Sequence, residues 1–377
     1  MKNLALAACA LTATASAASA GGIERRGDPS QILFEEGRNY LQFSAATVHP
    51  NVSGPPIGTA AAIGATPTGN IQNSYESYAL GFKHQFNDRL ALAFVIDEPV
   101  GASVNYRTAP YTGPGTGAFF GASNAEVSSI AFTAMAKYEV VDNISVYGGV
   151  RYQGLKGDIT VISPATGPAG GPGPYTLSVD NDFQLGYLVG AAYERPELAM
   201  RFALTYESKI EHSFRDNNGT PFDVEIPQAV TLHARSGIAP DTLLFGSIRW
   251  REWTAFNVQP ADFFSYSPVP GTPPVNTSIA SGTSDIWTYE LGLGRRFSEN
   301  WSGAAIIGYE KDNGDVVGNL SGTDGYVSYG LAVTYETESW EITSGIRYID
   351  VGSANSSVTG FTGSDAIAVG TQVGFKF

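Results

Sequence analysis

The stretch Ser364–Phe377 at the C-terminal end constrains the fold more than any other part of the chain. Its odd positions from Ile367 to Phe377 are apolar apart from Thr371, and its even positions from Ala368 to Lys376 are small or polar. A period of two places the two sets on opposite faces of a β-strand. Such a strand is expected either at the edge of a soluble sandwich or as the last strand of a closed membrane barrel, where it pairs with the first strand.

The same alternation recurs along most of the chain. Trp287, Tyr289 and Leu291 share one face of a segment whose other face carries Thr288 and Glu290. The pattern predicts about fourteen strands, with ends that can shift by a few residues. Their expected ranges are 38–49, 74–86, 90–107, 124–139, 143–162, 176–194, 197–211, 223–238, 241–256, 284–297, 300–312, 325–337, 339–351 and 364–377.

The lengths of the connections between these strands distinguish the two folds. Tight turns such as Asn87-Asp88-Arg89 and Arg195-Pro196 alternate with long loops rich in Gly, Pro, Ser and Thr. Outer-membrane barrels have this rhythm, with short periplasmic turns and long external loops, and a soluble sandwich has no reason to keep it. The long loops are expected at 50–73, 108–123, 163–175, 257–283 and 352–363.

Aromatic residues gather beside the short turns and the C-terminus. Such residues favour the membrane–water interface, and core aromatics of a soluble protein would be spread along the strands instead. We therefore predict an all-β fold, a transmembrane antiparallel β-barrel in the bacterial outer membrane that forms over residues 38–377. The expected girdle comprises Phe86, Tyr138, Tyr193, Phe297, Trp301, Tyr335, Trp340 and Phe377.

The first twenty residues have the features of a secretory signal peptide. A short positive start is followed by the apolar run Leu4–Leu11 and the small-residue cleavage site Ala18-Ser19-Ala20. Cys9 is the only cysteine, so the exported chain is expected to contain no disulfide or thiolate site. The excess of 36 acidic over 22 basic residues argues against nucleic acid as a partner.

The segment 21–37 differs from the predicted barrel. It is charged, contains Pro29 and shows no alternation. Because it precedes the first strand on the periplasmic side, we expect it to fold back into the barrel as a hatch. The alternative is a disordered periplasmic tail.

An ordered set of motifs along the mature chain resembles the FadL/TodX family of outer-membrane transporters. The resemblance begins at Asp28-Pro29-Ser30-Gln31-Ile32-Leu33-Phe34, where the family usually has Asn-Pro-Ala at the first three positions. The further matching stretches are Val52-Ser53-Gly54, Gln85-Phe86-Asn87-Asp88-Arg89-Leu90, Glu98-Pro99-Val100-Gly101, Ile226-Pro227, Trp250-Arg251-Glu252-Trp253-Thr254-Ala255-Phe256, Ser284-Asp285-Ile286-Trp287, Leu291-Gly292, Thr323-Asp324 and Tyr329-Gly330-Leu331-Ala332.

The resemblance implies a barrel of fourteen strands whose hatch blocks the lumen. It also implies passive uptake of long-chain fatty acids or related hydrophobic compounds, which are captured at external loops and released through the lumen or sideways through the wall. Such a barrel is expected as a monomer in outer-membrane lipid. Asp28, Pro29, Ser30 and Phe34 are the expected gating residues of the hatch.

A fatty acid requires a cation for its carboxylate and an apolar site for its chain. Strand parity places Arg151 and Arg201 on the luminal face, and we select them as carboxylate partners. The alternative is that luminal charges form a salt-bridge ladder that fills a narrow barrel. External capture is expected at two aromatic clusters in long loops, with the packing of loops against each other as the alternative. These clusters are Phe119-Phe120 and Phe263-Phe264, the latter with Tyr266.

No catalytic motif is evident. The histidines His49, His84, His212 and His233 are scattered, and there is no Gly-x-Ser-x-Gly elbow. We therefore expect neither enzymatic activity nor a metal or other cofactor. The remaining alternatives are an open porin for polar solutes, a structural or adhesion barrel, and an outer-membrane hydrolase.

Overall fold

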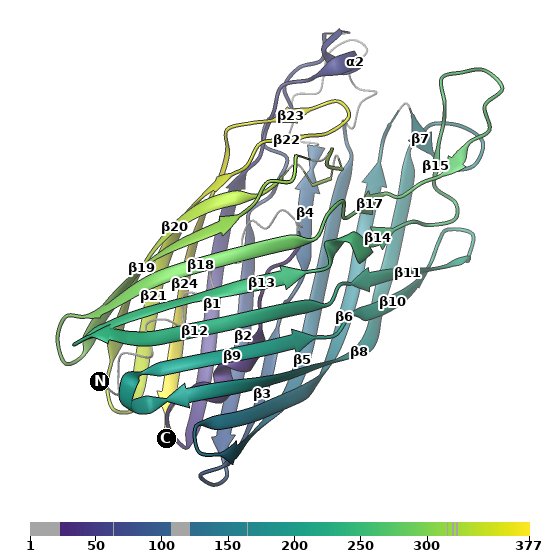
Figure 1. Cartoon of the computed structure of the whole chain (residues 1–377). Coiled ribbons are helices and arrows are strands. Elements are labelled where there is room, and N and C mark those ends of the chain that lie inside the picture. The colour runs from purple at the N-terminus through teal and green to yellow at the C-terminus, as the bar shows by residue number, and fades with distance from the viewer. Residues whose placement is uncertain are drawn as a thin grey trace.

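The structure of the protein is a computed structural model that describes residues 23–62, 64–106, 121–163, 165–314, 316–318, 320–321 and 323–377. The expected signal peptide lies outside these ranges. Within them the chain forms one closed antiparallel barrel with strongly tilted strands (Figure 1). The wall strands are β1 (Asn39–Asn51), β2 (Tyr75–Gln85), β3 (Leu90–Asp97), β4 (Gly101–Asn105), β5 (Asn124–Val141), β6 (Ile144–Val161), β8 (Tyr175–Arg195), β9 (Met200–Glu207), β12 (Ala229–Ala239), β13 (Thr242–Arg251), β18 (Ile286–Arg296), β19 (Trp301–Glu310), β20 (Tyr326–Glu336), β21 (Trp340–Val351) and β24 (Ser364–Lys376).

The wall has 14 strand positions, as predicted, because β3 and β4 pair one after the other with β5. The barrel closes where the C-terminal strand meets the first strand. In that ladder Tyr40 lies opposite Lys376 and Asn51 lies opposite Asp365. The expected pairing of Ser364–Phe377 with the first strand is therefore confirmed, and no strand edge is left open along this contact.

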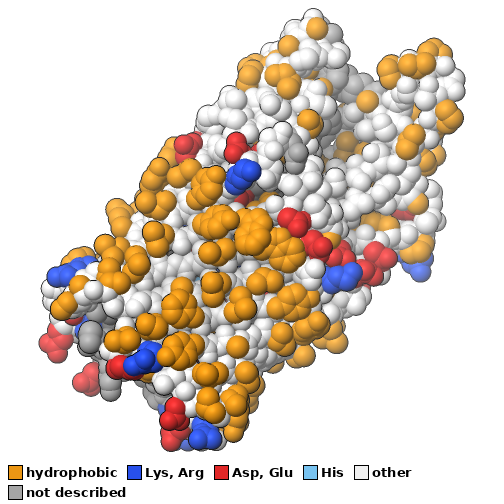
Figure 2. Space-filling view, viewed as in Figure 1, with side chains coloured by type: hydrophobic (Ala, Val, Ile, Leu, Met, Phe, Trp, Pro, Cys, Tyr) orange, Lys and Arg blue, Asp and Glu red, His pale blue; other side chains and the backbone are white. Residues whose placement is uncertain are grey.

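The apolar face of the strands points outward, which the alternation by itself does not determine. Leu185 and Leu331 are 71% and 63% exposed, whereas Ala368 and Thr205 on the opposite face are fully buried. Figure 2 shows the resulting band of hydrophobic side chains on the wall, with charged side chains mainly near its two ends. This is the inverse of a soluble protein and fits a wall that contacts lipid.

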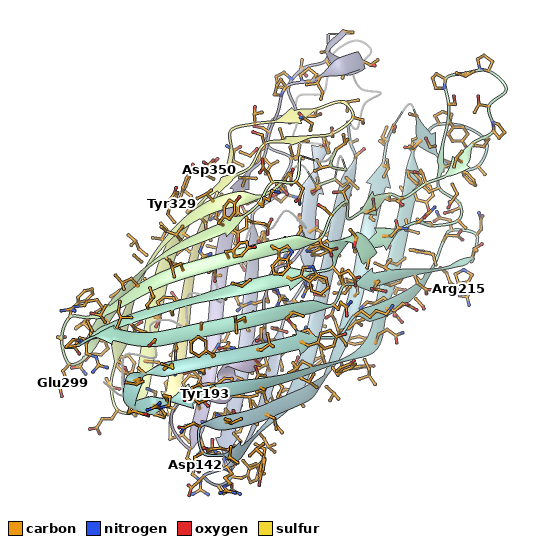
Figure 3. The ribbon with its side chains drawn as sticks, in the orientation of Figure 1. Asp142, Tyr193, Arg215, Glu299, Tyr329 and Asp350 are labelled. Carbon is orange, nitrogen blue, oxygen red and sulfur yellow. The ribbon has the colours of Figure 1, made fainter. Side chains whose placement is uncertain are left out.

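Aromatic side chains form two outward-facing groups at different heights. The predicted girdle lies beside the short turns, where Tyr335 packs on both Trp301 and Trp340 with ring centroids 4.9 and 5.3 Å apart. A second group lies toward the long loops and was not predicted. Tyr193 of the first group and Tyr329 of the second are labelled in Figure 3. The second group comprises Tyr187, Trp287, Tyr289, Tyr309, Tyr329 and Tyr348.

Four predicted strands are wrong in their extent. The predicted strand 90–107 is interrupted at 98–100, where Pro99 has no N–H for the ladder. The predicted strand 197–211 divides at 208–209, and the predicted strand 223–238 divides at 227–228, where Pro227 lacks an N–H. The predicted strand 241–256 ends at Arg251, before a short 3₁₀ helix.

The remaining elements are short and belong to the N-terminal segment, one short connection and the long loops. Within the described ranges, no helix has the length and apolar character needed to cross a membrane. These elements are η1 (Pro29–Phe34), α2 (Gly58–Ala62), β7 (Thr166–Gly167), η3 (Pro196–Leu198), β10 (Ile210–Arg215), β11 (Pro221–Ile226), η4 (Trp253–Ala255), β14 (Asn257–Val258), β15 (Phe264–Ser265), β16 (Val275–Asn276), β17 (Ala280–Ser281), β22 (Ala354–Asn355) and β23 (Gly360–Phe361).

Candidate binding pocket and the N-terminal segment beneath it

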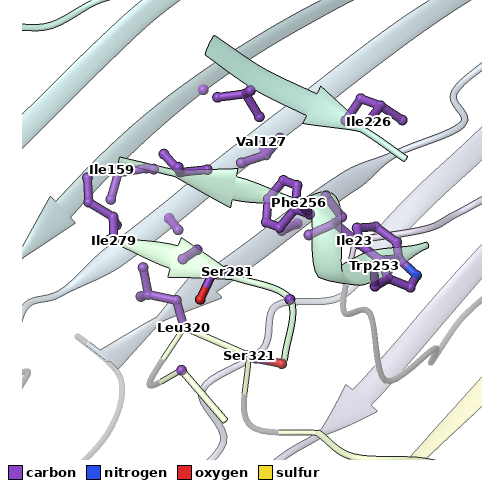
Figure 4. Close-up of a pocket in the computed structure, with 18 of the residues that line it drawn as sticks. Ile23, Val127, Ile159, Ile226, Trp253, Phe256, Ile279, Ser281, Leu320 and Ser321 are labelled. Atoms are coloured by element: carbon purple, nitrogen blue, oxygen red, sulfur yellow. The ribbon is translucent and has the colours of Figure 1, made fainter. Parts of the chain in front are cut away.

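An apolar cavity lies inside the barrel toward the long loops (Figure 4). Its empty volume is about 1340 Å³, including space that is open to solvent. We call it the upper pocket. Its walls come from β5, β6, β8, the β10–β11 hairpin and the segments around η4 and β17, and Ile23 of the N-terminal segment also faces it. Other apolar residues that line it include Val127, Leu155, Ile159, Leu177, Val179, Phe214, Phe222, Val224, Ile226, Trp253, Phe256, Val258, Ile279 and Leu320.

The inner face of the wall changes character along single strands. On β6, the buried inward side chains of Arg151 and Gln153 are followed by the buried apolar side chain of Leu155. The β10–β11 hairpin adds Phe214 and Phe222, which face each other in its ladder with ring centroids 5.9 Å apart. The upper pocket is therefore suited to apolar ligands.

Two charged residues line the upper pocket among the described residues. Lys156 is exposed, at a register shift between β6 and β8. Asp324 is buried, and its carboxylate accepts hydrogen bonds from the backbone N–H groups of Asn313 and Gly314 at 3.0 and 2.8 Å. The Asp324 charge is thus compensated by the loop backbone, and the pocket presents mainly apolar atoms to a ligand.

A second cavity, with an empty volume of about 1120 Å³, lies in the barrel, and most of the residues that line it are polar or charged. We call it the lower chamber. The N-terminal segment contributes residues from Glu24 to Glu35 to its lining, and the wall contributes Asp97, His233, Arg249 and Glu290. The segment therefore faces both cavities, with Ile23 in the apolar one and Glu24 in the charged one.

Ion pairs tie the start of the N-terminal segment to the wall. Glu24 accepts from Arg249 at 2.8 Å and lies 3.2 Å from Arg251, while Glu207 pairs with Arg249 at 2.7 Å and with Arg151 at 3.0 Å. These side chains are 5–11% exposed. Because a buried charge that loses its partner is costly, the network holds the segment in place.

Asp28 caps the short helix η1 and anchors the segment on the opposite wall. Its carboxylate accepts from the Ser30 N–H at 2.8 Å and from the Thr205 hydroxyl at 2.7 Å, and His233 lies 3.5 Å away. Burial alone would raise the pKa of Asp28, but the His233 contact and the hydrogen bonds lower it below its ordinary value. The anchor is therefore a carboxylate at neutral pH.

Phe34, at the end of η1, is held between cations and an aromatic ring. The Arg201 guanidinium lies 4.3 Å and the Lys137 ammonium 4.5 Å from the Phe34 ring centroid, and Tyr147 meets the ring edge-on at 5.4 Å. Arg201 also donates to the Gln31 carboxamide oxygen at 2.8 Å. These cation–π and hydrogen-bond contacts fix the end of η1 against β5, β6 and β9.

The wall is interrupted between β3 and β4, and the N-terminal segment covers the interruption from inside. The β2–β3 ladder ends where Leu80 faces Ile96. Beyond it, Glu24 bridges Val100, and the N–H of Gly101 donates to the Ile23 carbonyl oxygen at 2.7 Å. A Cβ at position 101 would lie too close to Cζ of Arg25, so a larger residue there would force the Arg25 side chain to move.

Comparisons with known proteins place this geometry in a family. The sequence model described as "Outer membrane protein transport protein (OMPP1/FadL/TodX)" matches residues 7–310. The chain belongs to this family. It is an outer-membrane β-barrel transport protein, and members of its family carry hydrophobic compounds. None of the curated proteins compared with the chain matches it.

Solved structures share the fold of this FadL/TodX family member at low sequence identity. A Pseudomonas aeruginosa FadL homologue is 14% identical with a TM-score of 0.74, and 93% of each chain is covered. The Pseudomonas putida toluene transporter TodX is 11% identical with a TM-score of 0.65, over 93% of this chain and 92% of that chain. The Ralstonia pickettii toluene transporter TbuX is 11% identical with a TM-score of 0.61, over 94% and 97%.

The departure from the Asn-Pro-Ala pattern that the FadL/TodX resemblance implies has a structural counterpart. Asp28 uses both carboxylate oxygens as acceptors, one for the Ser30 N–H and one for the Ser30 and Thr205 hydroxyls. The Ser30 hydroxyl also lies 3.3 Å from that of Thr205. An alanine at position 30 would lack this hydroxyl. Asp28 and Ser30 therefore form one hydrogen-bonded group with Thr205 in this chain.

The two arginines selected from the sequence lie in the lumen but do not line the upper pocket. Arg151 pairs with Glu207, and Arg201 contacts Gln31 and Phe34. Their role as carboxylate partners stays a prediction, and the contacts of Arg151 are those of the alternative salt-bridge ladder. Among the described residues, no group of three or more His, Cys, Asp or Glu side chains is placed to hold a metal ion.

The predicted capture residues can be placed in part. Phe263 is 1% exposed and packs on Tyr175 with ring centroids 4.9 Å apart, while Phe264 is half-buried in β15. These contacts are of the kind expected from loop packing, and the capture role stays a prediction. Phe119 and Phe120 lie outside the described residues.

The sequence interpretation missed the β10–β11 hairpin, which supplies a large part of the upper pocket. A usable signal was present. Ile210, His212 and Phe214 alternate before a turn at 216–219, Asp-Asn-Asn-Gly, and Phe222 and Val224 alternate after it. Two alternating runs around an Asn-Gly turn predict a hairpin.

Replacing Arg151 or Arg201 by alanine tests their predicted roles. We expect Arg201→Ala to loosen the N-terminal segment and Arg151→Ala to leave Glu207 with one partner instead of two. Each loss is expected to lower the free energy of unfolding by about 1–3 kcal/mol. Thermal unfolding in detergent and fatty-acid binding are measured together. A loss of affinity without a loss of stability would support the carboxylate role, and unchanged affinity would return both residues to the luminal network.

Proposed function

We propose that this outer-membrane protein takes up long-chain fatty acids or related hydrophobic compounds passively, with the upper pocket as their binding site. The observation that carries the proposal is the apolar pocket that adjoins a charged chamber inside one barrel. An apolar molecule gains about 25 cal/mol for each Å² that it buries, so we expect the upper pocket to hold it more strongly than the charged lower chamber. Uptake requires no chemical reaction, so the chain acts as a passive transporter rather than as an enzyme.

The contrast between the apolar upper pocket and the charged lower chamber also supports release through the wall. A route along the barrel axis would take an apolar molecule past the ion pairs of Glu24, Arg249 and Glu207, where it would displace water from charged groups. The interruption between β3 and β4 adjoins the upper pocket at Ile23 and Ala102. We therefore propose lateral release into the membrane, with the stretch 23–26 as the part that must move.

We propose that residues 21–37 form the gating hatch, in which Asp28, Pro29, Ser30 and Phe34 hold the closed state. The contacts of Asp28 with Thr205 and of Phe34 with Arg201 support this role, because both join the hatch to the far wall. The barrel ladder closes on itself through β1 and β24, which supports a monomer surrounded by outer-membrane lipid.

Uptake measurements test the proposed function directly. In a host that lacks its own transporter of this kind, expression of the chain is expected to accelerate uptake of labelled fatty acid or toluene. Proteoliposomes that contain the chain are expected to remain closed to sugars in a swelling assay. Sugar permeation without hydrophobic uptake would establish a porin instead, and the absence of both would contradict a transport role.

A further inference from the structure

The β10–β11 hairpin is attached to the barrel along a hinge line. The β9–β12 ladder stops where Glu207 faces Ala229, and the hairpin ladder begins where Ile210 faces Ile226. Residues 208–209 and 227–228 lie between these two ladders, and they do not pair with each other. Pro227 has no N–H for a ladder hydrogen bond. Both connections of the hairpin to the barrel are thus unpaired at the same point. The hairpin can rotate there as one unit, because few backbone hydrogen bonds oppose the rotation.

The two ends of the hinge are fixed to the barrel. The N–H of Ser208 donates to the Tyr187 carbonyl oxygen at 2.8 Å. The Gln228 side chain donates to Glu252 at 2.8 Å and accepts from Tyr206 at 2.8 Å. Movement of the hairpin therefore need not disturb β9 or β12.

A seam separates the hairpin from the neighbouring wall strand β8. On its other edge β8 pairs with β6 as far as Tyr175, but no ladder joins β8 to β10, which belongs to a separate sheet. Asp182 makes the main polar contacts across the seam. Its carboxylate accepts from the Ser213 N–H at 3.0 Å, and its carbonyl oxygen lies 3.0 Å from the His212 ring nitrogen Nδ1.

The upper pocket lies directly behind this seam. Leu177 and Val179 line it from β8, and Phe214 and Val224 line it from the hairpin. On the outer side, the seam begins beside Leu185, which is 71% exposed. Apolar side chains are thus present on both sides of a narrow line of contacts.

A buried polar atom at the seam favours its opening. The His212 side chain is fully buried, and its Nε2 has no hydrogen-bond partner among the described residues. A buried ring nitrogen without a partner destabilises the closed arrangement. The closed seam therefore combines a few side-chain hydrogen bonds with one unfavourable atom.

We propose that the seam between β8 and β10 is a side entrance to the upper pocket, opened by outward rotation of the β10–β11 hairpin. The molecules admitted are apolar or amphiphilic compounds at the outer surface of the membrane, next to Leu185. The entrance is separated from the interruption between β3 and β4 by the strands β5, β6 and β8. This inference rests on the proposed function, because the entrance serves the same pocket.

A disulfide across the seam tests the entrance. A Cβ built on Gly186 would lie 2.6 Å from Cγ1 of Ile210, so the two β-carbons come within about 4 Å, which suits a disulfide. In the Gly186→Cys/Ile210→Cys variant, oxidation is expected to slow uptake of labelled fatty acid or toluene roughly tenfold, because the disulfide holds the hairpin against β8. Reduction is expected to restore uptake, so the reduced protein is its own control.

A matched control crosses the hairpin rather than the seam. Ser213 and Asp223 face each other on its outer surface, and the oxidised Ser213→Cys/Asp223→Cys variant is expected to transport like its reduced form. In the opposite direction, Asp182→Ala removes the acceptor of the Ser213 N–H and is expected to raise uptake a few-fold.

The outcomes separate the entrance from the proposed function. Equal uptake by the oxidised and reduced seam variants, or no effect of Asp182→Ala, would overturn the entrance while transport by the unaltered chain stands. Absence of hydrophobic uptake by the unaltered chain would overturn the proposed function itself.

Discussion

The Leu177→Glu variant is expected to lose hydrophobic uptake almost completely. Leu177 is buried on the inner face of β8 and lines the upper pocket. A carboxylate at this point would have to be desolvated by any ligand that fills the pocket, and it would repel a fatty-acid head group. A cost of about 3 kcal/mol corresponds to a loss of roughly a hundredfold in affinity. Displacement of a fluorescent ligand in detergent measures the loss of affinity, and uptake in cells measures the loss of transport.

The neighbouring residue provides a matched control. Thr176 precedes Leu177 on the same strand, and its side chain is exposed, so Thr176→Glu adds the same charge outside the pocket. A third variant, Leu177→Lys, separates substrate classes, because an ammonium excludes a neutral hydrocarbon but attracts a carboxylate. If Leu177→Glu folds and still transports at the normal rate, the upper pocket is not on the pathway.

Deletion of residues 21–37 is expected to turn the closed barrel into an ion-conducting one. Without Glu24, Asp28 and Phe34, the arginines and Thr205 that contact them face an empty, charged lumen that water will fill. Barrels of about 16 strands already enclose aqueous channels, and a barrel of 14 without its internal segment approaches this size. Planar-bilayer recordings are expected to show steady conductance for the deletion and almost none for the complete chain.

Two finer variants show which part of the hatch matters. Asp28→Asn keeps the segment but removes the charge that holds Thr205 and His233, so we expect brief openings rather than a steady current. A cysteine pair at Glu24 and Val100, which bridge each other, should block hydrophobic uptake when oxidised and leave conductance low. If the deletion changes neither uptake nor conductance, the segment is not a gate.

Much of the barrel could be predicted because its signals are local. Alternation along each strand and the contrast between short turns and long loops depend on neighbouring residues, as the segment Ser364–Phe377 illustrates. The interruptions at Pro99 and Pro227 were missed, although proline marks such sites. A continuous alternating pattern on both sides of each proline led to the prediction of single strands.

The pocket was much harder to predict because distant segments assemble it. Ile23, Leu177 and Phe256 meet there only once the barrel has closed. Parity correctly placed Arg151 on the luminal face, but it could not reveal that Glu207 is its partner, since strand parity carries no information about height in the barrel. The aromatic cluster at Phe263 was selected for its composition, and its burial against Tyr175 depends on a loop path that composition does not encode.

The position of the N-terminal segment has a consequence for assembly. The segment immediately precedes β1, and the contact that seals the barrel joins Asn39 to Phe377, 338 residues apart. Contacts of such high sequence separation form late, because a long loop must close first. The segment is therefore free to enter before the first and last strands meet. A barrel that closes around the segment is sealed, and one that closes without it is leaky.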